Sequence, residues 1–139
     1  MNNSRESIYA ALFSLLQTAT GLTTASRRFK TWDQSTGTAL YQVQKSEKAT
    51  SKLPGAKRWE LSVDVYLYAV ADQSNTAPAT ALNALLDAIE AALQPEPGVK
   101  QTLGGLVDQA YIDGVIQVNT GDIGDVMFAI IPVTIVTGS

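Results

Sequence analysis

The segment Lys57–Ala69, KRWELSVDVYLYA, decides the fold of this 139-residue chain. From Trp59 onward, apolar residues alternate strictly with more polar ones: Trp59, Leu61, Val63, Val65 and Leu67 against Glu60, Ser62, Asp64, Tyr66 and Tyr68. Period-two alternation is typical of a β-strand that has one face on a hydrophobic core. The segment therefore predicts a long strand, covered on one face.

The length of this strand predicts a projecting hairpin. Residues 57–69 extend about 43 Å at roughly 3.3 Å per residue, whereas a compact chain of this length has a diameter of about 37 Å. Because the strand is longer than the body, we expect the hairpin 40–69 to project as an arm. Its tip lies in a basic loop at 45–58, KSEKATSKLPGAKR, which holds five of the ten Lys and Arg residues and one acid.

Charge is divided unevenly along the chain. Residues 1–58 hold nine Lys or Arg and three Asp or Glu, a net charge of +6, whereas residues 59–139 hold one basic residue and ten acids, a net charge of −9. Such asymmetry indicates a polyanion or another copy of the chain as partner. A basic arm on an acidic remainder favours head-to-tail self-association. The candidate contact residues are Lys45, Lys48, Lys52, Lys57, Arg58, Arg27 and Arg28.

Nucleic acid is the alternative partner for the basic 45–58 loop. Proteins that bind single strands interleave aromatic and basic side chains, so that bases can stack. Here only Trp59 lies beside the cluster, on the apolar face of its strand, and no basic helix, zinc finger or RNA-recognition signature is present. Direct DNA binding is therefore a weaker hypothesis than a protein-contacting arm. The other alternative is a solvated, flexible loop that contacts no partner.

Two amphipathic helices are predicted on either side of this hairpin. Apolar residues recur at helical spacing from Ile8 to Ala19, after a capping box of Asn3 and Glu6 and before a stop at Gly21. The second helix has an apolar stripe of Leu82, Leu85, Leu86, Ile89 and Leu93, with Pro78 in its first turn and Pro95 and Pro97 after its end.

Further strands complete the pattern. Residues 24–32 and 38–44 predict short strands, separated by a turn at 33–37. Residues 107–119 and 125–137 predict a hairpin around 120–124.

Two positions within that second hairpin are informative. One long strand over 107–119, bulged at Gly114, is favoured, although Asp113-Gly114 could instead form a tight type I′ turn. Pro132 marks an edge or a bulge, because proline cannot donate to a ladder. The last strand is apolar on both faces, so its second face needs a cover, such as another subunit or a second sheet.

The elements together predict a single α+β domain over residues 1–139. Its expected architecture is a mixed, mostly antiparallel β-sheet with two α-helices packed on one face and a projecting β-hairpin.

The composition argues against several functions. The chain has no cysteine and no histidine, which excludes disulfides, thiolate chemistry, Cys/His zinc sites and a histidine base. Thr120–Asp125 lacks the ligands of a calcium loop, and Gly104-Gly105 precedes a strand, not the helix of a phosphate-binding loop. We expect no enzyme activity, no cofactor and no metal. Apolar runs are too short for a membrane span, and Glu6 argues against a signal peptide, so we expect a soluble, unexported protein without a membrane partner.

Seven segments taken in order make the chain resemble the tail terminator, or tail-completion, family of tailed bacteriophages. They are SRESIYAALFSLL (4–16), TASRRFKTW (24–32), ALYQVQ (39–44), WELSVDVYLYA (59–69), ATALNALLDAIEAAL (79–93), QTLGGLV (101–107) and GDVMFAIIPVTI (124–135).

This resemblance implies a structural virion protein with no catalytic residues. It implies a homohexameric ring that caps the finished tail tube, halts tube growth and joins the tail to the head. The implied partners are further copies of the chain, the tail tube protein and a head-completion or stopper protein. The implied location is the head-proximal end of the virion tail, and the host cytoplasm during assembly. Another neck or head-completion role is the alternative within the phage particle.

Overall fold

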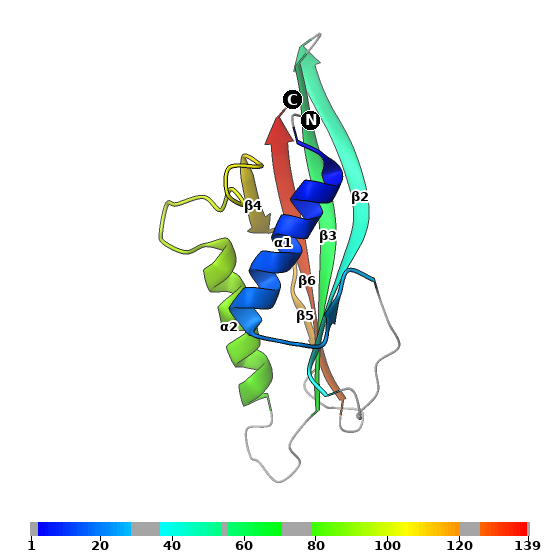
Figure 1. Cartoon of the computed structure of the whole chain (residues 1–139), viewed down its shortest axis with the longest axis vertical. Helices are drawn as coiled ribbons and strands as arrows, with labels where there is room; N and C mark the ends of the chain where they lie inside the picture. The colour runs from blue at the N-terminus through cyan, green and yellow to red at the C-terminus, as the bar shows by residue number, and fades with distance from the viewer. Residues whose placement is uncertain (1–2, 29–36, 54–55, 71–78, 120–125, 139) are drawn as a thin grey trace.

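The computed structural model describes residues 3–28, 37–53, 56–70, 79–119 and 126–138. Within these residues, two helices pack on one face of a six-stranded sheet (Figure 1). In chain order the elements are α1 (Arg5–Thr20), β1 (Ala25–Ser26), β2 (Ala39–Leu53), β3 (Ala56–Val70), α2 (Thr80–Leu93), β4 (Gln109–Ile112), β5 (Gln117–Asn119) and β6 (Val126–Gly138). The predicted α+β fold is confirmed.

The sheet is mixed and mostly antiparallel. Its order is β1-β2-β3-β6-β4, with β5 also on β6, and only the β1–β2 pair is parallel among the described strands. The alternating segment forms β3, which pairs with β6 from Arg58 to Val70 and with β2 on its other side. The β2–β3 hairpin is therefore held in the sheet for most of its length. Its end beyond Arg58 extends past β6 and above both helices (Figure 1).

Helix α1 has sharply defined ends. The Ser4 hydroxyl oxygen accepts a hydrogen bond from the Ser7 N–H at 3.2 Å, and Gly21 ends the helix with φ +68°. The predicted capping box of Asn3 and Glu6 is wrong, because Ser4 occupies the cap position and Glu6 lies in the first turn, paired with an arginine outside the helix. Serine is among the best N-cap residues, and glycine at the C-terminal end accepts the left-handed conformation.

Helix α2 carries the predicted apolar stripe. It begins after Ala79, whose side chain makes no capping hydrogen bond, and it ends at Leu93, before Pro95 and Pro97. Pro78, residues 29–36 and the turn predicted at 120–124 lie outside the described residues. Of the strand predicted at 24–32, the described part contains the two-residue strand β1.

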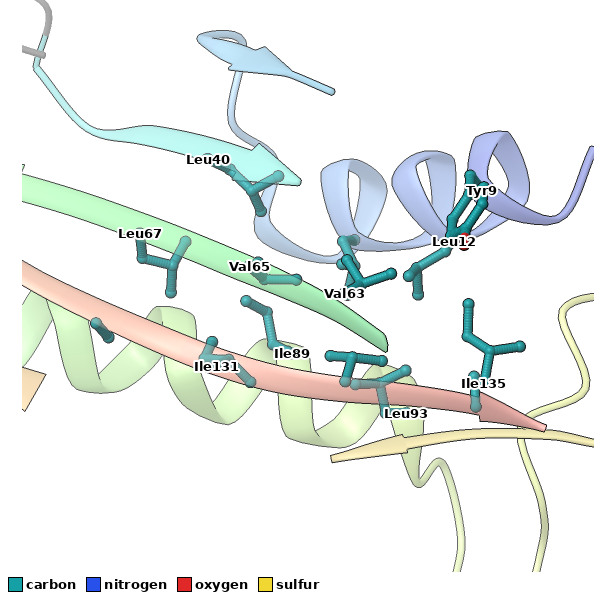
Figure 2. Close-up of a cluster of buried hydrophobic side chains, with 14 of the residues drawn as sticks. Tyr9, Leu12, Leu40, Val63, Val65, Leu67, Ile89, Leu93, Ile131 and Ile135 are labelled. Atoms are coloured by element: carbon teal, nitrogen blue, oxygen red, sulfur yellow. The ribbon is translucent and has the colours of Figure 1, made fainter. Parts of the chain in front are cut away.

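The core lies between the helices and the facing side of the sheet (Figure 2). Alternate residues of β3 and β6 meet the apolar stripes of both helices. Aliphatic core side chains from both helices, β3 and β6 are at most 1% exposed: Ile8, Leu12, Leu16, Leu61, Val63, Val65, Leu67, Leu82, Ile89, Ile131, Val133 and Ile135. Burying a side chain of this kind contributes about 1.5–3 kcal/mol. These contacts attach both helices to one face of the sheet.

The segment 107–119 forms two strands on one partner. Ile112 pairs with Val133 and Gln117 with Ile130, so four residues intervene on one side and two on the other. Both strands run antiparallel to β6, which excludes the tight-turn alternative at Asp113-Gly114. The prediction of one long strand over 107–119 is wrong, because the irregular residues 113–116, which include Gly114, separate β4 from β5.

Pro132 explains the position of this interruption. The Asp113 N–H donates to the Pro132 carbonyl oxygen at 3.0 Å. Because the N–H and C=O of a strand residue point to the same side, the missing donor of Pro132 faces the interruption, where no ladder bond is lost. Gly114 has φ +119°, and a Cβ atom built there would lie 3.3 Å from the Pro132 Cγ. The prediction that Pro132 marks a bulge is confirmed.

Candidate interaction surface

The basic residues predicted to make contacts fall into two groups that the structure keeps apart. Lys45, Lys48 and Arg58 are exposed on the β2–β3 hairpin. Arg27 and Arg28 follow β1, which pairs with the opposite end of β2. The seven residues from that end to Lys48 span about 23 Å of extended strand. The predicted contact residues therefore do not form one surface: those on the hairpin and those after β1 lie on two separate surfaces.

The predicted 45–58 loop is mostly strand. β2 continues to Leu53 and β3 begins at Ala56, so the loop prediction is wrong for these residues. Pairing with β3 covers most of this stretch, with register shifts between Gln44 and Ser46 and between Thr50 and Leu53. The side chains of Lys52 and Lys57 lie outside the described part of the chain.

A β-bulge at Lys45 determines which side chains of β2 face the helices and which face away from them. Gln44 pairs with Val63 and Ser46 with Ser62, so Lys45 is the extra residue. A bulge of one residue reverses the alternation beyond it. Glu47 therefore faces the helices, and Lys48 faces away from them.

Glu47 anchors the hairpin to α1. Its carboxylate accepts hydrogen bonds from the Arg5 Nε at 2.6 Å and from the Tyr9 hydroxyl at 2.8 Å. The buried Gln42 side chain donates to the Tyr9 carbonyl at 2.9 Å, which adds a second tie between β2 and α1. Partial burial raises the pKa of Glu47, but the hydrogen bonds from Arg5 and Tyr9 outweigh it and leave this pKa below its ordinary value. Burial of the Tyr9 side chain and its hydrogen bond to the Glu47 carboxylate raise the pKa of Tyr9.

Trp59 belongs to the same junction. It lies on the helix-facing side of β3, half-buried, with the Arg5 guanidinium 5.3 Å from its ring centroid. A cation–π contact of this kind contributes about 0.5–1 kcal/mol at an exposed site. The aromatic ring nearest the basic cluster thus packs against α1, on the side of the sheet away from Lys48.

Arg27 has a partner of its own. Its guanidinium forms a two-pronged hydrogen bond with the Glu6 carboxylate, with Nη2 to Oε2 at 3.3 Å. This pair lowers the pKa of Glu6 and ties the segment after β1 to the first turn of α1. Arg28 is exposed, and its backbone N–H donates to the Ser26 hydroxyl at 3.1 Å.

The hairpin cations make weak ion pairs within the chain. Lys45 Nζ lies 3.9 Å from the Asp64 carboxylate, and Arg58 Nη2 lies 3.6 Å from Asp108. Both cations are 63% exposed. Exposed pairs contribute only about 0–1 kcal/mol, so these side chains can exchange partners at little cost.

The face of the sheet opposite the helices carries an apolar row. Phe128, Ile130 and Val136 of β6 are half-buried there, and no described helix covers them. The Tyr68 ring lies 6.1 Å from that of Phe128 and 6.0 Å from that of Tyr41. The prediction that the last strand is apolar on both faces is confirmed, and the identity of its cover stays a prediction.

The two edges of the sheet differ. Beyond Tyr41, β2 has no strand partner on its outer side among the described residues. The opposite edge is β4. Its residue Ala110 forms an isolated antiparallel bridge with Gln101. An unpaired strand edge presents N–H and C=O groups that another strand can use.

A groove of about 600 Å³ runs between the end of α2 and β4. Its walls are mainly apolar, and Glu90 and Lys100 are the charged residues in its lining: Glu90, Leu93, Gln94, Gly98, Val99, Lys100, Gln109, Tyr111, Ile112 and Ile116. Three valines along this edge are unusually exposed, Val99 at 48%, Val115 at 80% and Val118 at 46%. We call the groove and these valines the groove edge.

The polar residues near β4 do not form a metal site or a paired acid site. Asp108 and Asp113 are both exposed; Asp108 lies near Arg58, and Asp113 accepts a hydrogen bond from Thr134 at 3.4 Å. The described part of the chain holds no cluster of three or more His, Cys, Asp or Glu side chains suited to a metal ion. No described helix is long and apolar enough to cross a membrane.

Sequence reasoning missed Glu47 and the groove edge. Glu47 is the single acid in the basic stretch, and that isolation was a usable signal. No local pattern marked the groove edge. Its walls come from the end of α2 and from β4, and β4 is placed there by its pairing with β6, which lies later in the chain.

Comparison with known proteins gives a likeness of fold. No family model matches the chain, and no curated protein matches its sequence. A solved structure described as "Virion of native gene transfer agent (GTA) particle" contains a chain of similar fold, with a TM-score of 0.58 and 11% sequence identity. The match covers 95% of each of the two chains. At this identity, the likeness shows a shared fold.

Proposed function

We propose that this chain is a structural virion protein that forms a ring of six copies on the end of a phage tail tube. The ring ends tube polymerisation and provides the surface that joins the tail to the head. The observation that carries the proposal is the likeness of fold, over 95% of both chains, to a chain of a gene transfer agent virion. The resemblance of the quoted segments to tail terminators supplies the finer role.

The surfaces of the chain suit such an assembly. The apolar row on β6 gains a cover when a second protein packs on it, and the β2 edge gains a strand or side-chain partner. The partners on this proposal are further copies of the chain, the tail tube protein and a head-completion or stopper protein. The chain acts at the head-proximal end of the tail, after assembly in the host cytoplasm, without catalysis or a cofactor.

The nucleic-acid alternative has less support from the geometry. Lys48 lies opposite Glu60 in the β2–β3 register, and Lys45 lies beside Asp64. Acids next to the cations weaken their field toward phosphates. Trp59 packs on the helix side and is not available for stacking on the lysine side. Another neck or head-completion role is compatible with the same fold likeness.

The decisive experiment is electron microscopy of particles made with and without this chain. We expect a ring at the head-proximal end of each tube when the chain is present, and overlong tubes without heads when it is deleted. Tubes of normal length that join heads in the deletion strain would overturn the proposal. A density located in the neck, away from the tube end, would favour the head-completion alternative.

DNA binding is tested separately by titration at several salt concentrations. On duplex DNA, the log–log slope should be about −0.9 for each phosphate contacted. A steep slope that Lys45→Gln/Lys48→Gln abolishes would support the nucleic-acid alternative. We expect no measurable binding at low salt.

A further inference from the structure

The outer side of β4 is paired at one position among the described residues. There the Ala110 N–H donates to the Gln101 carbonyl oxygen at 2.8 Å, in a bridge that is isolated. The Asp113 N–H donates to the Pro132 carbonyl oxygen of β6 at 3.0 Å, on the inner side. Successive residues of a strand direct their backbone groups to opposite sides. The N–H and C=O groups of Ile112 therefore point outward, as those of Ala110 do.

The outward groups of Ile112 open into the groove, which Ile112 lines together with Val99 and Lys100. The antiparallel bridge at Gln101 does not continue to Val99, whose N–H instead donates to the Glu96 carbonyl oxygen at 3.1 Å. The two segments therefore diverge after their bridge, and the groove lies between them and the end of α2. An open strand edge of this kind can pair with an extended segment of another chain.

The wall that α2 contributes is apolar at the end of the helix and acidic before it. α2 ends beside the bridge, because the Gln101 side-chain amide donates to the Ala92 carbonyl oxygen at 2.7 Å. From there β4 runs in the direction opposite to that of α2 (Figure 1). Leu93 is the apolar residue at the helix end, and Glu90 and Asp87 lie about one and two turns earlier.

This order predicts the spacing of side chains in a bound segment. Residues two apart in an extended segment share a face and lie about 6.6 Å apart along the strand, and one helical turn rises about 5.4 Å. A segment that pairs with Ile112 can therefore place an apolar side chain against Leu93 and a basic side chain, two residues away, near Glu90. Both side chains point to the helix side of the sheet, where α2 lies (Figure 1).

The charge around the groove is negative. Asp87, Glu90 and Glu96 are exposed, and no described ion pair includes them. Lys100 is the one basic residue among residues 79–119, which hold five acids. Lys48 of the hairpin lies on the sheet face away from the helices, so an edge-to-edge neighbour would not bring it to these acids. The complementary partner is therefore a basic segment of a different protein.

We propose that the groove binds an extended segment of a different protein, in which an apolar residue and a lysine or arginine are two residues apart. Its backbone pairs with Ile112, and its apolar side chain packs against Val99 and Leu93. Its basic side chain faces Glu90 and Asp87. The inference goes beyond the proposed ring and does not depend on it, because it names a surface for a partner other than a further copy.

Defined peptides test the binding of such a segment. The probe is a blocked heptapeptide of threonines with lysine at its third position and valine at its fifth, so that both share one face of a strand. One comparison peptide has glutamate in place of lysine, and another has lysine moved to the fourth position, on the opposite face. A third carries N-methyl groups along its backbone, which removes the main-chain donors.

Two variants of the full chain test the groove itself. Val99→Trp fills its mouth, and Val115→Trp is the matched control, because Val115 is 80% exposed and does not line the groove. Glu90→Gln removes an acid from the groove, and Glu60→Gln removes one from the sheet face away from the helices. Proton–nitrogen NMR titrations give the affinity and the place of binding, and thermal melting reports folding.

We expect the lysine–valine peptide to shift the amide signals of Val99, Ile112 and Ile116 in a saturable way. The Val99→Trp and Glu90→Gln chains should bind it at least threefold more weakly, and each comparison peptide should bind the wild type at least threefold more weakly. Binding should also weaken as salt rises. The two control chains should bind as the wild type does. Should Val99→Trp not fold, Glu90→Gln and the peptide series give the same comparison.

No saturable shift up to about 1 mM peptide, equal affinity for the glutamate peptide, or shifts confined to the β2 edge would overturn the inference. Sedimentation velocity adds one further outcome. If Val99→Trp abolishes self-association and Val115→Trp does not, the groove holds a further copy and the inference fails. All these measurements use the isolated chain, so their failure is distinguishable from failure of the proposed function, which electron microscopy of tube ends decides.

Discussion

Removing the Tyr9–Glu47 hydrogen bond should loosen the hairpin from α1 and lower the stability of the whole chain. Tyr9 is 1% exposed and its hydroxyl lies 2.8 Å from the Glu47 carboxylate, which Arg5 also contacts at 2.6 Å. Tyr9→Phe deletes only the hydroxyl, and Glu47→Gln deletes only the charge. Both substitutions keep the shape of the side chain, so packing around them changes little.

The expected magnitude follows from the kind of bond. A hydrogen bond to a charged group contributes about 1.5–3 kcal/mol, and the low end applies because the Glu47 side chain is 24% exposed. The Arg5 pair adds only about 0–1 kcal/mol, since Arg5 is 51% exposed. We expect a loss of about 1.5 kcal/mol for Tyr9→Phe and about 1 kcal/mol for Glu47→Gln. One kcal/mol corresponds to about 3 °C in Tm for a chain of this size.

A double-mutant cycle isolates the pair. Urea unfolding of the wild type, both single variants and the double variant should give a coupling energy of about 1 kcal/mol, because Tyr9→Phe costs less once the charge is gone. Tyr111→Phe is the matched control, since no hydrogen-bond partner of its hydroxyl is found among the described residues, and its effect should stay below about 0.5 kcal/mol.

The same pair should make stability depend on pH in the acid range. The pKa of Glu47 is lowered in the folded chain. A group with a depressed folded pKa contributes stability that is present above its unfolded pKa of about 4.3 and is lost as the pH falls through the folded pKa. Glu47→Gln should therefore flatten the fall in unfolding free energy below about pH 4.5. The reasoning would be refuted if the losses in unfolding free energy of Tyr9→Phe and Glu47→Gln simply added in the double variant, and if Glu47→Gln lost stability at low pH as steeply as the wild type.

Three further changes test the fold. Gly114→Ala places a Cβ 3.3 Å from Pro132 at φ +119°, so urea unfolding should show a loss of about 1–3 kcal/mol, and wild-type stability would contradict the described bulge. Leu12→Ala empties a fully buried site and should cost about 2–5 kcal/mol by the same measurement; a loss below 1 kcal/mol would contradict the burial of α1. Arg27→Gln should raise the pKa of Glu6 toward its ordinary value, as an NMR titration of its carboxyl would show, unless the pair does not form in solution.

Local patterns were sufficient for the helices and the central strand. The apolar stripes ending at Gly21 and before Pro95 predicted both helices, because a helix that packs on a sheet must repeat its apolar residues every three to four positions. The strict alternation through Trp59–Leu67 predicted β3, because one face of that strand is covered by helices. The backbone limits of proline also predicted the bulge beside Pro132.

Local sequence pattern was insufficient where the same residue types are compatible with two different structures. Ser4 caps α1 in place of Asn3, because both types accept N–H bonds and only the geometry of the chain selects one. The basic 45–58 stretch looked like a loop, since lysine and serine are common in turns and also tolerated on strand edges. Pairing with β3 keeps most of it extended.

The sequence by itself determined the two helices and the central strand, which of their faces are apolar, and that charge is split between the two parts of the chain. Only the tertiary structure decided where those charges lie. The bulge at Lys45 turns Glu47 toward α1 and Lys48 away from it, and the sheet order places the basic edge and the acidic groove edge on opposite sides of the molecule. The physical reason is that register and strand order depend on pairings between residues far apart in the chain, whereas periodicity reports only how a segment meets its immediate surroundings.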